Sequence, residues 1–202
     1  EISLNHVMMS IDRIFLDKFF DLKTIGIYSF ARSLMQILNP LARTFKTAFI
    51  PYFYRTINSL SFNDEVKKSF YVYNLIILLF ISIICLYVGD ILFIFGNEDY
   101  YGSEKLIFLL GVYLYLDSII LINYFLIQST SKTEYLLIGY ILKLLFFLIP
   151  FLIISWKNID ISIYIFTIIY IFSNIIYLFY LNTVKYLLRN VYYNFLLNIF
   201  YS

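Results

Sequence analysis

The sequence has little of the side-chain chemistry from which most active sites are built. It contains one cysteine, Cys85, and one histidine, His6, among 202 residues. A single cysteine excludes a disulfide framework, and no cluster of histidine, cysteine and carboxylate has the spacing of metal ligands. His6 stands alone in an apolar segment, where we expect ordinary packing. We therefore predict no metal site.

Sequence motifs of nucleotide and hydrolase chemistry are also absent. There is no G-x-x-x-x-G-K-[ST] loop for ATP, and there is no G-x-S-x-G or H-E-x-x-H segment. The net charge of +2 is scattered along the chain, without the basic block that binds nucleic acid. We expect no catalytic residues, no cofactor, no enzymatic activity and no nucleic-acid partner.

Charged residues are scarce, and apolar residues take their place. Only 14% of the residues are charged, whereas 62% are hydrophobic and 22% are aromatic. The mean hydropathy is +0.83. A soluble domain is nearer to about 45–50% apolar and about 25% charged. This composition is typical of a membrane protein whose Phe and Tyr side chains mostly face lipid or lie at the interface.

Long apolar segments predict membrane-spanning helices. A hydrocarbon core of about 30 Å needs roughly 20 apolar residues per helix. Such segments lie at residues 24–52, 70–88, 106–128, 135–155 and 161–182, and residues 2–20 resemble the end of a further helix. The sequence thus predicts an all-α polytopic membrane helix bundle of about six transmembrane helices over residues 1–182. Since residue 1 already reads as helix interior, we expect the chain to be part of a longer protein.

The charges at the segment ends predict an orientation. On one side, the connections 53–69 and 129–134 and the tail 183–202 carry an excess of cations, namely Arg55, Lys67, Lys68, Lys132, Lys185 and Arg189. The opposite side carries Lys105 and Lys157 among acidic residues, and Arg13, Lys18 and Lys23 add to it. By the positive-inside rule the first side is cytoplasmic. The tail is too short after Arg189 to span, so we expect a cytoplasmic or interfacial helix.

One apolar segment, ARSLMQILNPLARTFKTAF at residues 31–49, carries a line of polar side chains. At 100° per residue, five of them lie within about 40° of one line along a helix, namely Arg32, Gln36, Asn39, Arg43 and Lys46. Pro40 cannot donate a hydrogen bond to the carbonyl of Gln36, so we expect a bend there and a free acceptor near the line.

Positive charge inside a membrane helix is costly. A central cation costs about 2.5–3.5 kcal/mol on insertion scales, whereas Leu, Ile or Phe returns about 0.3–0.6 kcal/mol. Lys46 lies near enough to one end to reach the interface, but Arg32 and Arg43 flank the middle. Two interpretations remain open, namely structural contacts with a second half of the protein and a water-filled cavity that receives a ligand. We predict the cavity.

Two further charges are expected near mid-membrane. Asp117 belongs to the segment 106–128 and Lys143 to the segment 135–155, which are consecutive and therefore antiparallel. We predict that the two side chains could pair directly. A structural ion pair and a role in ion coupling both remain open.

Three segments together resemble one family of membrane proteins. SIDRIFLDKFFDLKTIGIYSFARSL at residues 10–34 has the Asp12-Arg13 pair late in one helix and a glycine-tyrosine-serine pattern opening the next. ILFIFGNEDYYGSEKL at residues 91–106 is similar to an external turn, and FIPYFYR at residues 49–55 to a proline-bearing helix end. In this order they resemble polysaccharide exporters of the O-antigen flippase type, within the multidrug/oligosaccharidyl-lipid/polysaccharide exporter superfamily.

The resemblance implies the C-terminal half of a two-lobed exporter fold in the bacterial plasma membrane, with a missing N-terminal half as its partner. It implies transport of undecaprenyl-pyrophosphate-linked oligosaccharide by alternating access. Arg32, Arg43 and Lys46 would attract the pyrophosphate, while Gln36 and Asn39 would bind sugar hydroxyls. Candidates for coupling to a proton or sodium gradient are Asp12, Arg13, Asp117 and Lys143.

Other functions remain open alternatives. A drug or cation antiporter of the same superfamily is expected to favour acidic cavity residues, whereas the longest polar line here is basic. A membrane-embedded polysaccharide polymerase or ligase usually needs a large external loop, and the connection 89–105 is short. The third alternative is an inactive truncated product.

Overall fold

The computed structural model describes residues 13–56, 62–95, 100, 102–129, 133–157 and 161–200. Its regular elements are helices, beginning with a helical run at 13–19. The others are α2 (Leu22–Gln36), α3 (Asn39–Thr56), α4 (Phe62–Leu86), α5 (Val88–Phe95), α6 (Glu104–Ser129), α7 (Glu134–Trp156) and α8 (Ile163–Phe200). The predicted all-α class is confirmed for this part of the chain.

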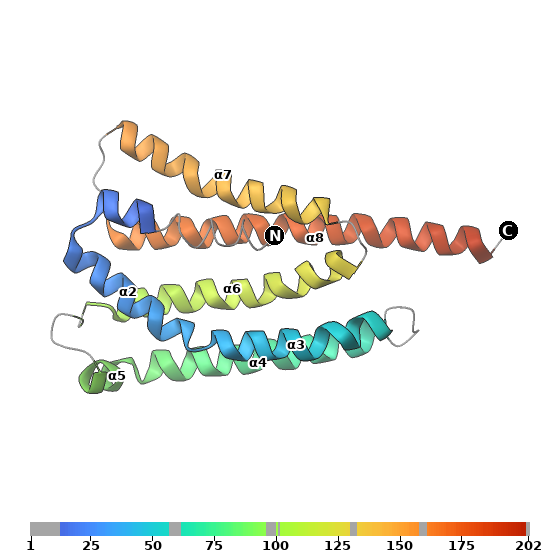
Figure 1. The fold of residues 1–202 in the computed structure, drawn as a ribbon, viewed down its shortest axis with the longest axis horizontal. Helices are drawn as coiled ribbons and strands as arrows, with labels where there is room; N and C mark the ends of the chain where they lie inside the picture. Colours follow the sequence, from blue (N-terminus) through green and yellow to red (C-terminus); the bar gives the residue numbers. More distant parts are fainter. Residues whose placement is uncertain are drawn as a thin grey trace.

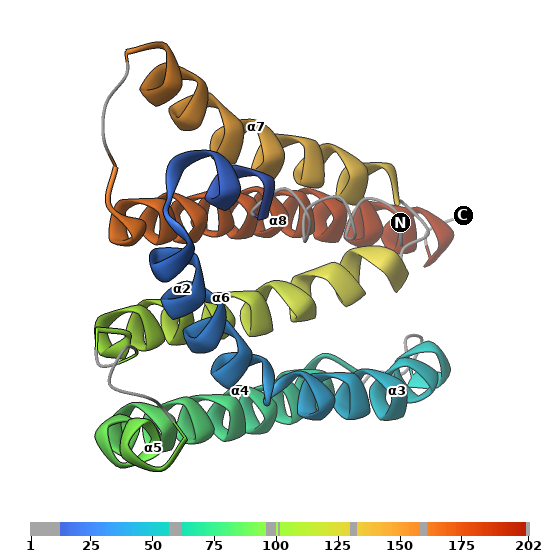
Figure 2. The same cartoon turned by 60° about the vertical axis from the view of Figure 1, so that its left-hand side comes forward.

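The helices are arranged in two layers. Helices α7, α8, α6 and α4 lie side by side in that order, and α2 crosses α6 on one face of them (Figure 1; Figure 2). Helix α6 is central, because it packs against α8 on one side, α4 on the other and α2 across the face. The part of the predicted polar segment that belongs to α2 therefore lies against the middle of the bundle.

Aromatic side chains form the core where α2, α7 and α8 meet. Phe147, Phe151 and Phe166 are fully buried, and the ring of Tyr28 packs edge-on against Phe166 with centroids 5.7 Å apart. Phe15, from the run 13–19, lies 4.9 Å from Phe151, centroid to centroid. Aromatic contacts add about 0.5–1.5 kcal/mol each to the burial of the rings.

Three helical segments among the described residues are long and apolar enough to cross a membrane. They are Lys68–Leu86, Glu134–Trp156 and Ile163–Val184. Large apolar side chains are exposed on all three, for example Leu79, Leu152 and Phe172. A hydrocarbon environment accounts for this exposure, because in water it would be unfavourable. The remaining spans of the predicted six stay a prediction.

The segment 24–52, which the sequence predicts as one helix, is two helices in the structure. Helix α2 ends at Gln36, and the amides of Ile37 and Leu38 donate to the carbonyls three residues earlier instead of four. Helix α3 begins at Asn39, which places Pro40 in its first turn, where a missing N–H costs nothing. The expected effect of Pro40 is thus larger than a bend, since the chain starts a new helix.

Two other predicted boundaries differ from the observed ones. The connection 89–105 contains α5, which follows α4 after a single intervening residue, Tyr87. Helix α8 continues to Phe200 without a break, whereas the sequence predicted a span 161–182 and a separate tail helix 183–202. The location of that tail relative to the membrane stays a prediction.

Helices α7 and α8 approach closely at Gly139. A Cβ atom at this position would lie 2.5 Å from Cε2 of Tyr177 and 2.9 Å from two ring atoms of Tyr180. Only glycine fits there, because ordinary carbon contacts are about 3.5–4.0 Å. Lys143 follows Gly139 by one turn of α7, so the same contact brings the ring of Tyr177 close to Lys143.

Candidate functional site

The polar face of α2 lines two adjoining cavities. One face of this helix carries the polar side chains Ser29, Arg32, Ser33 and Gln36, which follow one another at helical spacing. This face partly overlaps the side of α2 that buries Tyr28 and Ala31. Tyr28, Arg32 and Gln36 contribute to both cavities. The half-buried Arg32 side chain therefore stands at the wall that the two cavities share.

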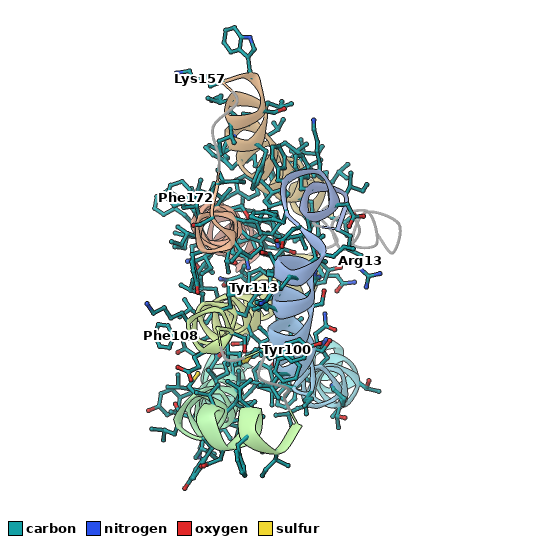
Figure 3. The ribbon with its side chains drawn as sticks, turned by 90° about the vertical axis from the view of Figure 1, so that its left-hand side faces the viewer. Arg13, Tyr100, Phe108, Tyr113, Lys157 and Phe172 are labelled. Carbon is teal, nitrogen blue, oxygen red and sulfur yellow. The ribbon has the colours of Figure 1, made fainter. Side chains whose placement is uncertain are left out.

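The larger cavity has a volume of about 300 Å³. Besides the α2 residues it is lined by Arg13, Leu16 and Asp17 from the helical run 13–19. Arg13 and Asp17 are both exposed, so the cavity carries charge of both signs at its rim. In Figure 3, Arg13 lies on the side of the α2 layer that faces away from α8.

The smaller cavity has a volume of about 80 Å³ and extends between α2 and α6. Arg32 and Gln36 line it from α2, and Asn39 lines it from the start of α3. Tyr113 and Asp117 line it from α6, with Tyr170 from α8. Arg32 interacts electrostatically with both tyrosine hydroxyls. A cation, a carboxylate and two amides thus converge on one small volume.

Three of the five predicted ligand-binding residues therefore meet at one cavity, namely Arg32, Gln36 and Asn39. The side chains of Arg43 and Lys46 lie outside the described residues, as does Asp12. The predicted line of polar residues assumed one straight helix, but the segment divides at residues 37–38. Arg43 and Lys46 therefore belong to α3, whose axis differs from that of α2.

Asp117 and Lys143 do not form the direct pair that the sequence allowed. In this described region the two charges interact electrostatically, but no ion pair of 4 Å or less joins them. The Asp117 side chain is exposed towards the smaller cavity, whereas only 6% of Lys143 is exposed. The two residues come from α6 and α7, and α8 lies between these helices (Figure 1).

The two broad faces of the molecule differ in character. Phe108 and Phe172, which are 60% and 55% exposed, project from the layer on the side opposite to Arg13 (Figure 3). That side suits lipid, while the α2 side presents hydroxyl, amide and charged groups. In a hydrocarbon environment such groups must face water or protein, because each unsatisfied polar group costs several kcal/mol.

Asp21 fixes the start of α2 outside the apolar segments. The backbone N–H of Thr24 donates a hydrogen bond of 3.3 Å to Oδ1 of Asp21, which is the N-cap of the helix. Hydrogen bonds from Thr24 lower the pKa of this carboxyl below its usual value. The cap sets where the helix begins and therefore the angular position of Arg32 three turns later.

Several cavity residues were not predicted from the sequence. Asp17, Ser29 and Ser33 extend the polar surface, and Tyr113 and Tyr170 close the smaller cavity. The spacing of Ser29 and Ser33 relative to Arg32 and Gln36 is that of one helix face, which was a usable signal. The two tyrosines carried no such signal, because they are two of 21 tyrosines in the chain.

No protein-family model, no curated protein and no solved structure matches this chain. Within the described residues, no group of three or more His, Cys, Asp or Glu side chains could hold a metal ion. The features that bear on function are thus the two cavities and the sequence of residues 10–34, 49–55 and 91–106.

Proposed function

We propose that this chain is one half of a membrane transporter that moves undecaprenyl-pyrophosphate-linked oligosaccharide across the bacterial plasma membrane for surface polysaccharide synthesis. The observation that carries the proposal is the position of Arg32 at the wall between two cavities. A guanidinium attracts phosphate and binds two of its oxygens through parallel hydrogen bonds.

The neighbouring groups support the same ligand class. Gln36 lines both cavities and Asn39 lines the smaller one, and their amides both donate and accept hydrogen bonds. Ser29 and Ser33 add hydroxyl groups on the larger side. Amide and hydroxyl groups around one cation are suited to a head group that combines phosphate with sugar.

The division between α2 and α3 supports an alternating-access mechanism. Only two residues, Ile37 and Leu38, join α2 to α3, and they lie beside Gln36 and Asn39. A joint inside a helix allows one part to change direction while the other stays packed. In this proposal, movement at residues 37–38 exposes Arg32 and its cavities to one side of the membrane at a time.

The test compares charge with shape at Arg32 in the full-length parent protein. We expect Arg32→Lys, which keeps the charge and loses the paired hydrogen bonds, to lose less transport than Arg32→Gln. Arg32→Gln should lose about 10- to 150-fold, the equivalent of a charge-assisted hydrogen bond of about 1.5–3 kcal/mol. Transport is measured with a fluorescent lipid-linked oligosaccharide in proteoliposomes and by complementation of polysaccharide export in cells.

Lys105→Gln is the matched control, because Lys105 is an exposed cation at the start of α6 that lines neither cavity. It should transport normally. Membrane insertion should survive in every variant, since removal of a cation from a helix makes insertion easier. Normal export by Arg32→Gln at normal protein level would refute the proposed role of the cavity.

A cation antiporter is the second candidate, because Asp117 also faces the smaller cavity. A carboxylate there would attract a cationic substrate. The two functions predict opposite results for efflux of cationic dyes. An antiporter loses efflux in Asp117→Asn and keeps it in Arg32→Gln, whereas the oligosaccharide transporter shows no dye efflux in any form.

A further inference from the structure

Lys143 lies inside a cage of tyrosine rings in the middle of the bundle. Its Nζ is 5.9 Å from the ring centroid of Tyr113, 6.0 Å from that of Tyr170 and 5.7 Å from that of Tyr177. Among the described residues, Nζ makes no hydrogen bond and no ion pair. The rings are thus the direct surroundings of this buried cation, each attracting it through its π face.

The face of α8 that supplies two of these rings also carries a buried amide. Asn174 lies within about 60° of Tyr170 and Tyr177 on the helical projection. It is 0% exposed, and neither its Nδ2 nor its Oδ1 has a hydrogen-bond partner in the described part of the chain. Its Oδ1 can accept a hydrogen bond from an ammonium, and its Nδ2 can donate one to a neutral amine.

Two of the three rings belong both to the cage and to the wall of the smaller cavity. The hydroxyl of Tyr113 donates a hydrogen bond of 3.3 Å to the hydroxyl of Tyr170, and the rings stack with centroids 4.5 Å apart. Both tyrosines line the smaller cavity together with Asp117. Figure 3 shows Tyr113 between α6 and α2. The same pair therefore separates Lys143 from the space that Asp117 faces.

We propose that Lys143 is the proton-carrying group of this transporter, and that Asp117 exchanges the proton with the cavity. The inference rests on the proposed function and names the coupling ion and its site. In the first step movement of α7 relative to α6 brings the two side chains together, an N–H bond of the ammonium breaks and an O–H bond forms at the carboxylate of Asp117, which leaves a neutral amine and a carboxylic acid. In the second step the acid releases the proton to water in the cavity.

The groups around Lys143 are suited to this exchange. Helix α6 supplies Tyr113 and Asp117, helix α8 supplies Tyr170 and Tyr177, and Tyr140 of α7 itself packs on Tyr177 with centroids 5.1 Å apart. The ring faces stabilise the ammonium, and the same apolar surroundings accept the neutral amine. The charged and neutral forms of Lys143 then favour different distances between α7 and α6 at Asp117. Proton binding is thereby linked to helix movement.

The decisive substitution is Lys143→Arg, because a guanidinium keeps the charge and cannot release a proton in a protein. Lys143→Met removes the charge and keeps a similar length. In proteoliposomes of the full-length parent protein, a proton gradient should accelerate wild-type transport of lipid-linked oligosaccharide. Both variants should transport at equal rates with and without the gradient. Gradient-driven acceleration in Lys143→Arg, or acceleration of the wild type by sodium and not by protons, would overturn the inference.

A second measurement does not depend on transport. A change of charge beside three tyrosine rings alters their near-ultraviolet spectrum, so the wild type should show a pH-dependent difference spectrum below about pH 9, where tyrosine hydroxyls stay protonated. Lys143→Arg and Lys143→Met should lack it. A wild type without this signal, or a signal that persists in Lys143→Met, would contradict the inference. Failure of the wild type to move the lipid at all would instead refute the proposed function, and the spectra would still test Lys143.

Discussion

Replacing Gly139 by alanine tests the contact that places the tyrosine cage. The added methyl carbon would lie 2.5 Å from Cε2 of Tyr177 and 2.9 Å from Cδ1 and Cε1 of Tyr180. Since ordinary carbon contacts are about 3.5–4.0 Å, the Tyr177 ring would have to move by about 1 Å. That ring is 1% exposed and packed against Tyr140, so it has little freedom to move.

The expected magnitude follows from two opposing effects. Overpacking of a filled core costs about 1–3 kcal/mol, whereas glycine to alanine inside a helix gains about 0.5–1 kcal/mol. Gly26 in α2 provides the matched control, because a Cβ there meets nothing within 4 Å. Gly26→Ala should therefore show the gain alone. The difference between the two variants isolates the overpacking effect and should be about 1–3 kcal/mol.

The assay is reversible unfolding of the purified protein in mixed micelles of increasing SDS content, followed by helix content. Gly26→Ala should unfold at a higher SDS fraction than the wild type, and Gly139→Ala should unfold at a lower fraction than Gly26→Ala. If both alanine variants shift stability equally, α7 and α8 are not in close contact at Gly139, and the position of Tyr177 beside Lys143 would be wrong.

Two further predictions concern the orientation of the bundle and the start of α2. With the native cysteine replaced, a cysteine at Lys157 should react with an impermeant external thiol reagent in intact cells, and one at Glu134 should not. The reason is that the charge distribution predicts a cytoplasmic start of α7. Labelling at Glu134 and not at Lys157 would mean that the orientation is the reverse. The N-cap carboxylate of Asp21 has a lowered pKa in the folded protein, so its contribution to stability is complete above the usual carboxyl pKa and is lost as the pH falls through the folded value. Asp21→Asn should therefore remove part of the decline in melting temperature between about pH 5 and pH 2, and an unchanged decline would show that this cap contributes nothing.

The sequence alone determined the class of the protein. Its apolar content and long hydrophobic segments predict helices, because a helix satisfies its backbone hydrogen bonds within one segment in lipid. The same reasoning identified Arg32, Gln36 and Asn39 as members of one polar face, because their spacing follows the helical period. It also predicted a bend at Pro40, which cannot donate a backbone hydrogen bond, but it did not predict that the segment divides into two helices.

Only the tertiary structure decided how these groups are combined. Periodicity along one helix cannot show that the segment divides at residues 37–38, since the direction of the second helix depends on packing against α4 and α6. Nor could it show that Lys143 is surrounded by rings rather than joined to Asp117. That outcome depends on the close approach of α7 and α8 at Gly139, which is set by contacts between residues far apart in the sequence. Local sequence propensity does not encode such contacts. The tyrosine cage around Lys143 and its separation from the cavity therefore depend on how the helices pack.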